Sequence, residues 1–464
     1  MDIKKNALLT VKIHNLSYGG RGIGKYNGVV VFVPRTVPGD TVSARVVKRK
    51  ANYISAELVE VLESSPLRIK PKCDLFGICG GCSWQNIPYE DQLVFKEEIA
   101  RTTLEHIGRQ QDFTLHPIIA SPKKWRYRNK ADYTFGLDEK GEAVLGFHKP
   151  GSYFEILDVG SCHLQPSEFD VLVNEMRQFT RENNLEPYNP KTHEGNLRHF
   201  TLRYAEGNGA ESTGSVLAIL LTVEEDLPGT EDLVERLRKK CPGLKGFIHG
   251  LNRGKSDVAR MEQRLFQWGD DFLIDTLGEL KVRVSAPSFF QTNTRAAELL
   301  YEQTRGFLSL SGKEILIDAY CGTGTIGLYC AGEAGRVYGI EVLREAVWDA
   351  RFNADMNRID NCIFLCGEFR KSVPLLMDRL PCGFQRVVVD PPRSGLDKKS
   401  LRKIIELQAP VMVYVSCNPS TLARDAKLMC DAGYHITDLQ PVDMFPHTFH
   451  IELVARFEKP VKPV

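Results

Sequence analysis

Short apolar runs separated by glycine and proline turns fill the first sixty residues of the chain. The strand-like runs cover residues 8–13, 29–33, 41–47 and 54–62. The glycine-rich stretch 17–22 and the Pro-Gly-Asp stretch 38–40 are predicted to be turns between them. Short strands at regular spacing with such turns are typical of a small β-barrel, so we expect one over residues 1–62.

Residues 63–285 mix the two periodicities. Alternating, strand-like runs cover residues 196–203, 215–222 and 246–249, and residues 230–240 have the spacing of a helix. Runs of both kinds in one region indicate an α+β domain.

Residues 286–464 contain four apolar runs, three of them rich in β-branched residues, that are predicted to be buried strands: 314–318, 336–341, 387–389 and 411–415. The first run leads into a glycine-rich turn and then a helix, which is typical of a Rossmann-like parallel sheet. Such sheets bind ligands at the carboxyl ends of their strands. The predicted fold class is therefore multidomain α/β, with a barrel, a central α+β domain and a Rossmann-like C-terminal domain.

Composition places the chain among ordinary globular proteins. Of 464 residues, 42% are hydrophobic and 26% are charged. No apolar run is long enough for a transmembrane helix, and no signal core follows the first residues, so we expect a cytoplasmic protein with no membrane partner. The net charge is +1, but residues 1–60 hold ten Lys or Arg and four acids. A basic small barrel is a common platform for single-stranded RNA.

Two further stretches combine cations with aromatic rings. Residues 121–130 contain five cations, Trp125 and Tyr127, and residues 196–203 form a basic and aromatic strand. Cations meet phosphates and rings stack on bases, so the first stretch is predicted to contact single-stranded RNA and the second is a further candidate.

Three cysteines lie within ten positions, in Cys73-Asp-Leu-Phe-Gly-Ile-Cys79-Gly-Gly-Cys82. Glycines between them let the backbone curl so that the sulfurs converge on one metal centre. Cys162 is the best candidate for a fourth ligand, followed by His163. The spacing fits a tetrahedral zinc site and an iron–sulfur cluster equally well.

A nucleotide-like ligand is indicated by Gly322-x-Gly-x-x-Gly327 after the strand that ends at Asp318. Glu341 ends the next strand, where an acid can bind ribose hydroxyls. This motif alone fits NAD as well. Asp390-Pro-Pro at the end of the third strand favours S-adenosylmethionine, because similar strand ends close the active site in many methyltransferases.

Cys417 follows the strand 411–415 directly, so it lies at the ligand-binding edge of the predicted sheet. By position alone it could be a packed core thiol. Glu452 also follows an apolar stretch, where burial could raise the pKa of its carboxyl.

Taken together, these stretches resemble the uracil-5 RNA methyltransferases, in the branch with an N-terminal TRAM domain and a four-cysteine iron–sulfur cluster. The resemblance covers almost the whole chain. Besides Gly-Gly-Arg-Gly-Ile-Gly and Val-Pro-Gly-Asp in the barrel and the four cysteines, it rests on Phe-Phe-Gln291-Thr-Asn293, Asp318-Ala-Tyr-Cys-Gly-Thr-Gly, Asp390-Pro-Pro-Arg-Ser-Gly395, Ser-Cys417-Asn-Pro and Asp443-Met-Phe-Pro-His447-Thr-Phe-His450-Ile-Glu452. Ala319 departs from the larger apolar residue that the family usually shows.

The resemblance implies a role for each of these residues. Cys417 would be the nucleophile and Glu452 the general base. Residues around S-adenosylmethionine would be Gln291, Tyr320, Glu341 and Asp390. A [4Fe–4S] cluster would be held by Cys73, Cys79, Cys82 and Cys162. The partner would be structured RNA, with 23S ribosomal RNA favoured and transfer RNA possible, and the default oligomeric state is a monomer.

Two other functions stay open from the residues themselves. An N-methyltransferase would use Asp390-Pro-Pro without a nucleophile, although Arg393 stands where an aromatic residue would favour it. A non-catalytic RNA-binding or redox-sensing protein would need only the barrel and the cysteines.

Overall fold

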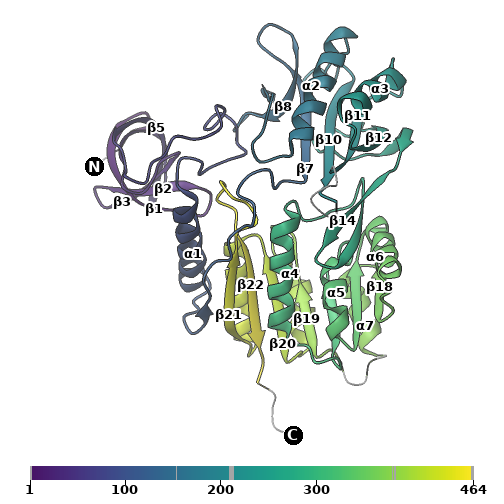
Figure 1. The fold of residues 1–464 in the computed structure, drawn as a ribbon. Helices are drawn as coiled ribbons and strands as arrows, with labels where there is room; N and C mark the ends of the chain where they lie inside the picture. Colours follow the sequence, from purple (N-terminus) through teal and green to yellow (C-terminus); the bar gives the residue numbers. More distant parts are fainter. Residues whose placement is uncertain (1–2, 153, 208–213, 379, 381–382, 461–464) are drawn as a thin grey trace.

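The computed structural model describes residues 3–152, 154–207, 214–378, 380 and 383–460. Within them the strands form a closed five-stranded barrel, a seven-stranded sheet, a two-stranded hairpin and an eight-stranded sheet. Figure 1 shows the barrel at the left, the seven-stranded sheet at the top and the eight-stranded sheet below it. None of the helices in these ranges combines the length and hydropathy needed to cross a membrane.

The barrel confirms the predicted N-terminal domain. Its strands are β1 (Leu8–Leu16), β2 (Arg21–Tyr26), β3 (Val29–Pro34), β4 (Thr41–Arg49) and β5 (Tyr53–Glu63). Buried and exposed positions alternate along β1 and β4, because successive side chains of a strand point to opposite faces. Valines and isoleucines such as Val11, Val42 and Ile54 fill the interior.

Strand β2 corrects the prediction of a simple turn over residues 17–22. The tight turn is confined to residues 18–20, and Arg21 and Gly22 already belong to the strand. A Cβ on Gly22 would lie 2.0 Å from Thr36 Oγ1, and one on Gly24 would lie 2.2 Å from a Val11 methyl. These glycines are therefore needed for close packing inside the barrel. Their high local frequency had led us to predict a loop.

The central domain is an α+β unit, as predicted. Its sheet has the order β13-β12-β11-β10-β7-β8-β9. The strands are β7 (Lys130–Leu137), β8 (Ala143–His148), β9 (Ile156–Asp158), β10 (Leu197–Ala205), β11 (Ser215–Thr222), β12 (Leu244–Leu251) and β13 (Gln263–Gly269). The helices α2 (Ser167–Glu182) and α3 (Thr230–Lys240) bury residues such as Phe169 and Leu237 in the core of this domain.

The C-terminal sheet has the order β18-β17-β16-β19-β20-β22-β21-β6. Five of its strands are parallel: β16 (Ile315–Ala319), β17 (Arg336–Glu341), β18 (Cys362–Cys366), β19 (Arg386–Val389) and β20 (Val411–Ser416). Strand β22 (Glu452–Glu458) runs antiparallel to β20 and to β21 (His435–Val442). The hairpin β14 (Phe272–Leu277) and β15 (Leu280–Ser285) precedes this sheet.

Helices cover both faces of this sheet. One group shares a core with the first face: α4 (Thr294–Leu308) and α5 (Thr325–Cys330), with α6 (Arg344–Met356) beside α5. The second group packs on the other face: α1 (Tyr89–His106), α7 (Phe369–Met377), α8 (Lys398–Glu406) and α9 (Pro419–Asp431). Helix α1 and the short strand β6 (Thr114–Leu115) therefore pack with the C-terminal sheet, although they fall within residues 63–285, the stretch expected to form the central domain.

Candidate active site

The strand order brings the predicted site residues to one edge of the C-terminal sheet. Tyr320 follows β16, Glu341 ends β17, Asp390 follows β19 and Cys417 follows β20. Because these strands are parallel, their carboxyl ends meet at the same edge. Glu452 joins them from the opposite direction, as the first residue of the antiparallel strand β22. The site is therefore assembled by topology from five neighbouring strands.

The glycine turn after β16 faces the acid at the end of β17. The backbone N–H of Gly322 donates to Glu341 Oε2 over 3.2 Å, and a Cβ on Gly322 would meet open space. Tyr320 has a φ of 66°, an uncommon value for a residue other than glycine that often marks a functional site. Burial raises the pKa of Asp318 to about 8, against a hydrogen bond from the Gly327 N–H that lowers it. The turn leaves room for a ligand beside Glu341.

Asp390 lies in the middle of the edge and is partly exposed, and desolvation of its carboxyl raises its pKa to about 7. The Gln291 side-chain amide approaches its carboxylate at 3.5 Å, at the long limit of a hydrogen bond. Gln291 is held by the segment that leads to α4, where Asn293 caps the helix by accepting from the Ala296 N–H. The structure thus places Gln291 beside Asp390.

Cys417 lies between a strand and a helix. Asn418 caps α9 by accepting from the Ser420 N–H, and Pro419 occupies the first turn, where its missing N–H costs nothing. The Asn-Pro pair therefore begins a helix directly after the thiol. The Asn418 side chain also donates to the Arg393 carbonyl over 3.1 Å. Strand end, cap and loop together hold the thiol in place.

Glu452 is a close neighbour of Cys417. In the antiparallel register Ser416 pairs with Leu453. Cys417 follows Ser416 and Glu452 precedes Leu453, so Cys417 and Glu452 lie side by side. Glu452 is only 4% exposed, and burial raises its pKa well above the ordinary value, with the Asp390 carboxylate as a second cause. The expected burial of this carboxyl is confirmed.

The pKa of Cys417 is raised to about 12, first by burial and then by Glu452 and Asp390. Arg393 is a cation near the thiol, and its charge lowers the pKa of both Cys417 and Glu452. A protonated Glu452 carries no charge and would not repel a thiolate. The ionisation of the two groups is therefore linked through their contact.

The barrel contributes a residue to this site that sequence analysis missed. The hydroxyl of Tyr18 donates to the carbonyl oxygen of Cys417 over 3.1 Å. Burial raises the pKa of Tyr18 to about 12, with Cys417 as the second cause. The Tyr18 ring also packs edge-on against Phe449 at 5.5 Å. The sequence showed only that Tyr18 lies in a glycine-rich turn of the barrel. That position suggested a contact with RNA and gave no sign of a contact with Cys417.

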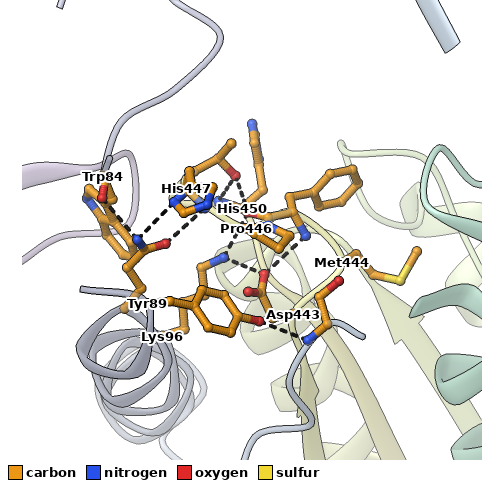
Figure 2. Close-up of polar contacts among 12 residues, drawn as sticks. Trp84, Tyr89, Lys96, Asp443, Met444, Pro446, His447 and His450 are labelled. Atoms are coloured by element: carbon orange, nitrogen blue, oxygen red, sulfur yellow. Dashed lines mark hydrogen bonds and ion pairs between the residues drawn. The ribbon is translucent and has the colours of Figure 1, made fainter. Parts of the chain in front are cut away.

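Helix α1 fixes the segment that leads to Glu452, residues 443–450 (Figure 2). Lys96 points from the helix toward Asp443, and their side chains form a fully buried ion pair of 2.6 Å. The same ammonium donates to the Phe445 carbonyl over 3.0 Å. A buried pair with further hydrogen bonds fixes one geometry, because any other arrangement leaves a charge unpaired.

His447 is held from two further directions. The backbone N–H groups of Ser83 and Trp84, directly after the cysteine segment, both donate to its carbonyl oxygen at 2.9 and 3.0 Å. Its ring stacks on Trp125 with centroids 3.7 Å apart. Burial lowers the pKa of His447 to about 4, so the ring is neutral. The cysteine segment and the segment before Glu452 are thus joined directly.

The stretch 121–130 does not present the free surface that its composition suggested. Trp125 packs on His447, and Tyr127 is buried with its hydroxyl donating to the Pro446 carbonyl. Four of the five cations are paired with acids: Lys123 with Glu206, Lys124 with Glu90, Arg126 with Asp170 and Lys130 with Asp132. The two rings and four of the cations in this stretch therefore make contacts within the protein, and its contact with RNA stays a prediction.

Residues 196–203 give a clearer correction. They form β10 in the middle of the central sheet, where Arg198 is 3% and Arg203 is 5% exposed. The Arg198 guanidinium donates to the Asn252 and Gly254 carbonyls, so it is satisfied inside the protein. This strand is not a surface for RNA, and the alternation of basic and apolar residues did not reveal its burial.

The four predicted ligand cysteines surround one cavity of about 470 Å³, which Arg393 and His450 also line. Cys82 accepts from the Gln85 side-chain amide at 3.1 Å and Cys79 from the Gly81 N–H at 3.4 Å. Across the ranges that the structure describes, no three His, Cys, Asp or Glu side chains meet closely enough to hold one metal ion. The donor set and the shared cavity fit a group several atoms across.

Two families of sequences match this chain. Residues 255–459 match the family described as tRNA (uracil-5-)-methyltransferase, and residues 4–59 match the TRAM domain. The chain is 38% identical to an uncharacterized RNA methyltransferase of Halalkalibacterium halodurans over 458 residues, or 98% of both chains. It is also 38% identical to one of Caldanaerobacter subterraneus, over 98% of this chain and 99% of the relative.

Among solved structures, the chain is similar to the tRNA (uracil-54, C5)-methyltransferase of Pyrococcus abyssi in complex with S-adenosyl-L-homocysteine. The identity is 29%, the TM-score is 0.75, and the match covers 97% of this chain and 100% of that one. The similarity extends over the barrel, the central domain and the C-terminal sheet. The chain therefore belongs to the tRNA (uracil-5-)-methyltransferase family, as an S-adenosylmethionine-dependent RNA uracil-5 methyltransferase with an N-terminal TRAM domain.

Proposed function

We propose that the chain methylates C5 of a specific uridine in structured RNA by covalent catalysis, with Cys417 as nucleophile and Glu452 as base. The observation that carries this proposal is the adjacency of the two side chains across β20 and β22, with Asp390 beside them. A thiol and a carboxyl are the two groups that the reaction needs on this edge.

The steps balance as follows. The Cys417 thiolate adds to C6 of uracil, and the electron pair of the C5–C6 bond moves to C5 and O4. C5 then attacks the methyl group of S-adenosylmethionine and releases S-adenosylhomocysteine. Glu452 removes the C5 proton, the C5–C6 double bond re-forms, and Cys417 leaves. Arg393 stabilises the thiolate, and Gln291, Tyr320, Glu341 and Asp390 bind the methyl donor.

The RNA target is proposed to be 23S ribosomal RNA, with transfer RNA as the second candidate. The barrel supports an RNA substrate, because all ten of its Lys and Arg side chains are exposed. Transfer RNA gains support from the similarity to the Pyrococcus abyssi enzyme. A monomer is proposed as the default oligomeric state, and an RNA substrate supports a cytoplasmic location.

A [4Fe–4S] cluster is proposed for the cavity of Cys73, Cys79, Cys82 and Cys162. Four thiolates are the usual ligands of such a cluster, and the N–H donors at Cys79 and Cys82 would stabilise charged sulfurs. We assign it a structural role beside residues 443–450. Iron and sulfide analysis of protein purified without oxygen should give four of each per chain, and stoichiometric zinc would overturn the assignment.

Trapping with 5-fluorouridine RNA tests the reaction, because fluorine at C5 cannot leave as a proton. The enzyme, S-adenosylmethionine and fluorinated total RNA should form an adduct on a peptide that contains Cys417, and the attached fragment would identify the target. Cys417→Ala should form none. Methylation of uracil C5 by Cys417→Ala, or a product methylated on nitrogen, would refute the mechanism.

A further inference from the structure

Six cations gather on the outer surface of α7 and α8, here called the α7–α8 surface. They line a hollow of about 720 Å³ together with Glu406: Arg370, Lys371, Lys398, Lys399, Arg402 and Lys403. On α8 these positions lie opposite the buried Ser400, Leu401 and Ile404, so the cations form a row on the solvent side. All except Lys403 are exposed.

Ion pairs neutralise only part of this surface. Glu368 pairs with Arg370 and Lys371, and Glu406 pairs with Lys403. Lys398, Lys399 and Arg402 have no acidic partner within ion-pair distance among the described residues. Counting Glu368, Asp397 and Glu406, the six cations leave a net charge of +3, on a chain whose total is +1. Like charges this close repel one another, so the row does not serve stability.

The α7–α8 surface is attached directly to the active site. Tyr320 stacks on Phe369, the first residue of α7, with centroids 6.0 Å apart. The Tyr320 hydroxyl is hydrogen-bonded to Ser400 of α8. The loop from Asp390 to α8 also carries Arg393, whose carbonyl accepts from Asn418 beside the thiol. The cations on α8 therefore begin at the end of the loop that starts at Asp390.

The barrel approaches the same edge from the other end of the sheet. It contacts α1, which packs near β21, whereas α7 packs near β17. Figure 1 shows the barrel toward the β21 end of the C-terminal sheet and α7 toward its β18 end. Cys417 follows β20, between these two ends. An RNA strand that contacts both basic surfaces would cross the edge at the thiol.

We propose that the α7–α8 surface binds the phosphate backbone of the substrate RNA on the side of the target uridine away from the barrel, an inference that rests on the proposed function. A row of long, exposed side chains over two helices suits an extended polyanion, which carries a charge at every nucleotide. A single small anion would need convergent donors instead. Four of the five cations at 121–130 are paired with acids, whereas three of the six cations in this row have no such partner among the described residues.

The test is the salt dependence of RNA binding. Full-length wild type and Lys398→Gln/Lys399→Gln/Arg402→Gln are titrated with a labelled oligouridine of about 20 nucleotides at several salt concentrations. Three lost phosphate contacts should lower the slope of log K against log salt by about 2, and weaken binding at least about tenfold at low salt. S-adenosylmethionine affinity and melting temperature should not change.

Three controls separate the outcomes. Lys398→Arg/Lys399→Arg keeps the charge and should keep the wild-type slope. Lys239→Gln/Lys240→Gln removes exposed lysines at the end of α3 and should also keep it. Arg370→Gln/Lys371→Gln tests the α7 side independently if the triple variant folds poorly. An unchanged salt slope in both surface variants would overturn the proposal. It would also be overturned if the variants bound RNA normally and lost only their binding to anionic lipid vesicles.

Methylation is measured on undermethylated total RNA in the same preparations, so that the two proposals can fail separately. Normal 5-methyluridine formation with an unchanged salt slope refutes the α7–α8 surface alone. Absence of 5-methyluridine from wild type refutes the proposed reaction, whatever the slope. Reduced 5-methyluridine yield that is restored by excess RNA supports the surface as a substrate contact.

Discussion

The hydroxyl of Tyr18 donates a hydrogen bond to the carbonyl oxygen of Cys417, although the two residues lie 399 positions apart. The N-terminal barrel therefore contacts the proposed active site directly. The bond fixes the peptide group next to the thiol. It also means that displacement of the barrel would be felt at the reacting atom.

Tyr18→Phe removes this bond and keeps the ring against Phe449. One net hydrogen bond contributes about 0.5–1.5 kcal/mol, so we expect single-turnover methyl transfer to slow by about two- to tenfold. RNA affinity should stay unchanged, because the loss is at Cys417. Tyr53→Phe, in the same barrel and packed on Phe32, should behave as wild type. Loss of RNA affinity with an unchanged rate would assign Tyr18 to the substrate instead.

The rate of methyl transfer should rise with pH. Burial raises the pKa of both Cys417 and Glu452, and each must lose its proton to act as nucleophile or base. We expect single-turnover rates with saturating RNA to increase across about pH 6 to 9. Glu452→Gln should still add to uracil but accumulate the methylated adduct. A rate that falls over this range would contradict the assignment of both roles.

Stability of the ligand-free chain should depend on pH in the opposite direction. The pKa of Asp318 is about 8 in the folded chain, compared with 3.8 ordinarily. The folded chain keeps a proton that the unfolded chain loses, so the free energy of unfolding falls as pH rises from about 4 to 8. Urea unfolding at several pH values should show this slope, and Asp318→Asn should flatten it. An equal slope in the variant would mean that other buried acids cause it.

Lys96→Met should be among the most destabilising single changes in α1. It leaves the Asp443 carboxylate buried without a cation to pair with, which costs about 3–5 kcal/mol of unfolding free energy. Lys96→Met/Asp443→Asn should recover part of the loss, since it removes the unpaired charge. Lys149→Met breaks a surface pair with Glu155 and should leave unfolding unchanged. If Lys96→Met and Lys149→Met lower the free energy of unfolding equally, the buried ion pair contributes no more to stability than the surface pair.

Cys82→Ser should lower folded yield and RNA affinity before it changes methyl transfer. The segment Cys82–Trp84 donates two N–H groups to His447, so disorder at the cysteines would loosen residues 443–450. Cys241→Ser, buried in the core of the central domain, is the matched control for loss of a thiol. Normal yield and binding with a collapsed single-turnover rate would instead place the cysteine cavity in the reaction.

Local sequence patterns predicted many of the strands, but they did not predict which side chains contact one another in the candidate site. Apolar runs and glycine turns predicted β16, β17, β19 and β20, and parallel strands place their ends together without further information. The contact of Glu452 with Cys417 depends on an antiparallel register that periodicity does not encode. Residues 121–130 misled because composition counts cations but does not show which ones have partners.

The pair of Lys96 and Asp443 also has a consequence for synthesis. The two side chains are separated by 347 positions, so α1 leaves the ribosome long before its buried partner exists. Until then its ammonium has to stay in water, and residues 443–450 are absent. Contacts of such long range form late in folding. A nascent chain can thus fold its N-terminal barrel early. The proposed active site can form only after residues 443–450 and β22 have been synthesised.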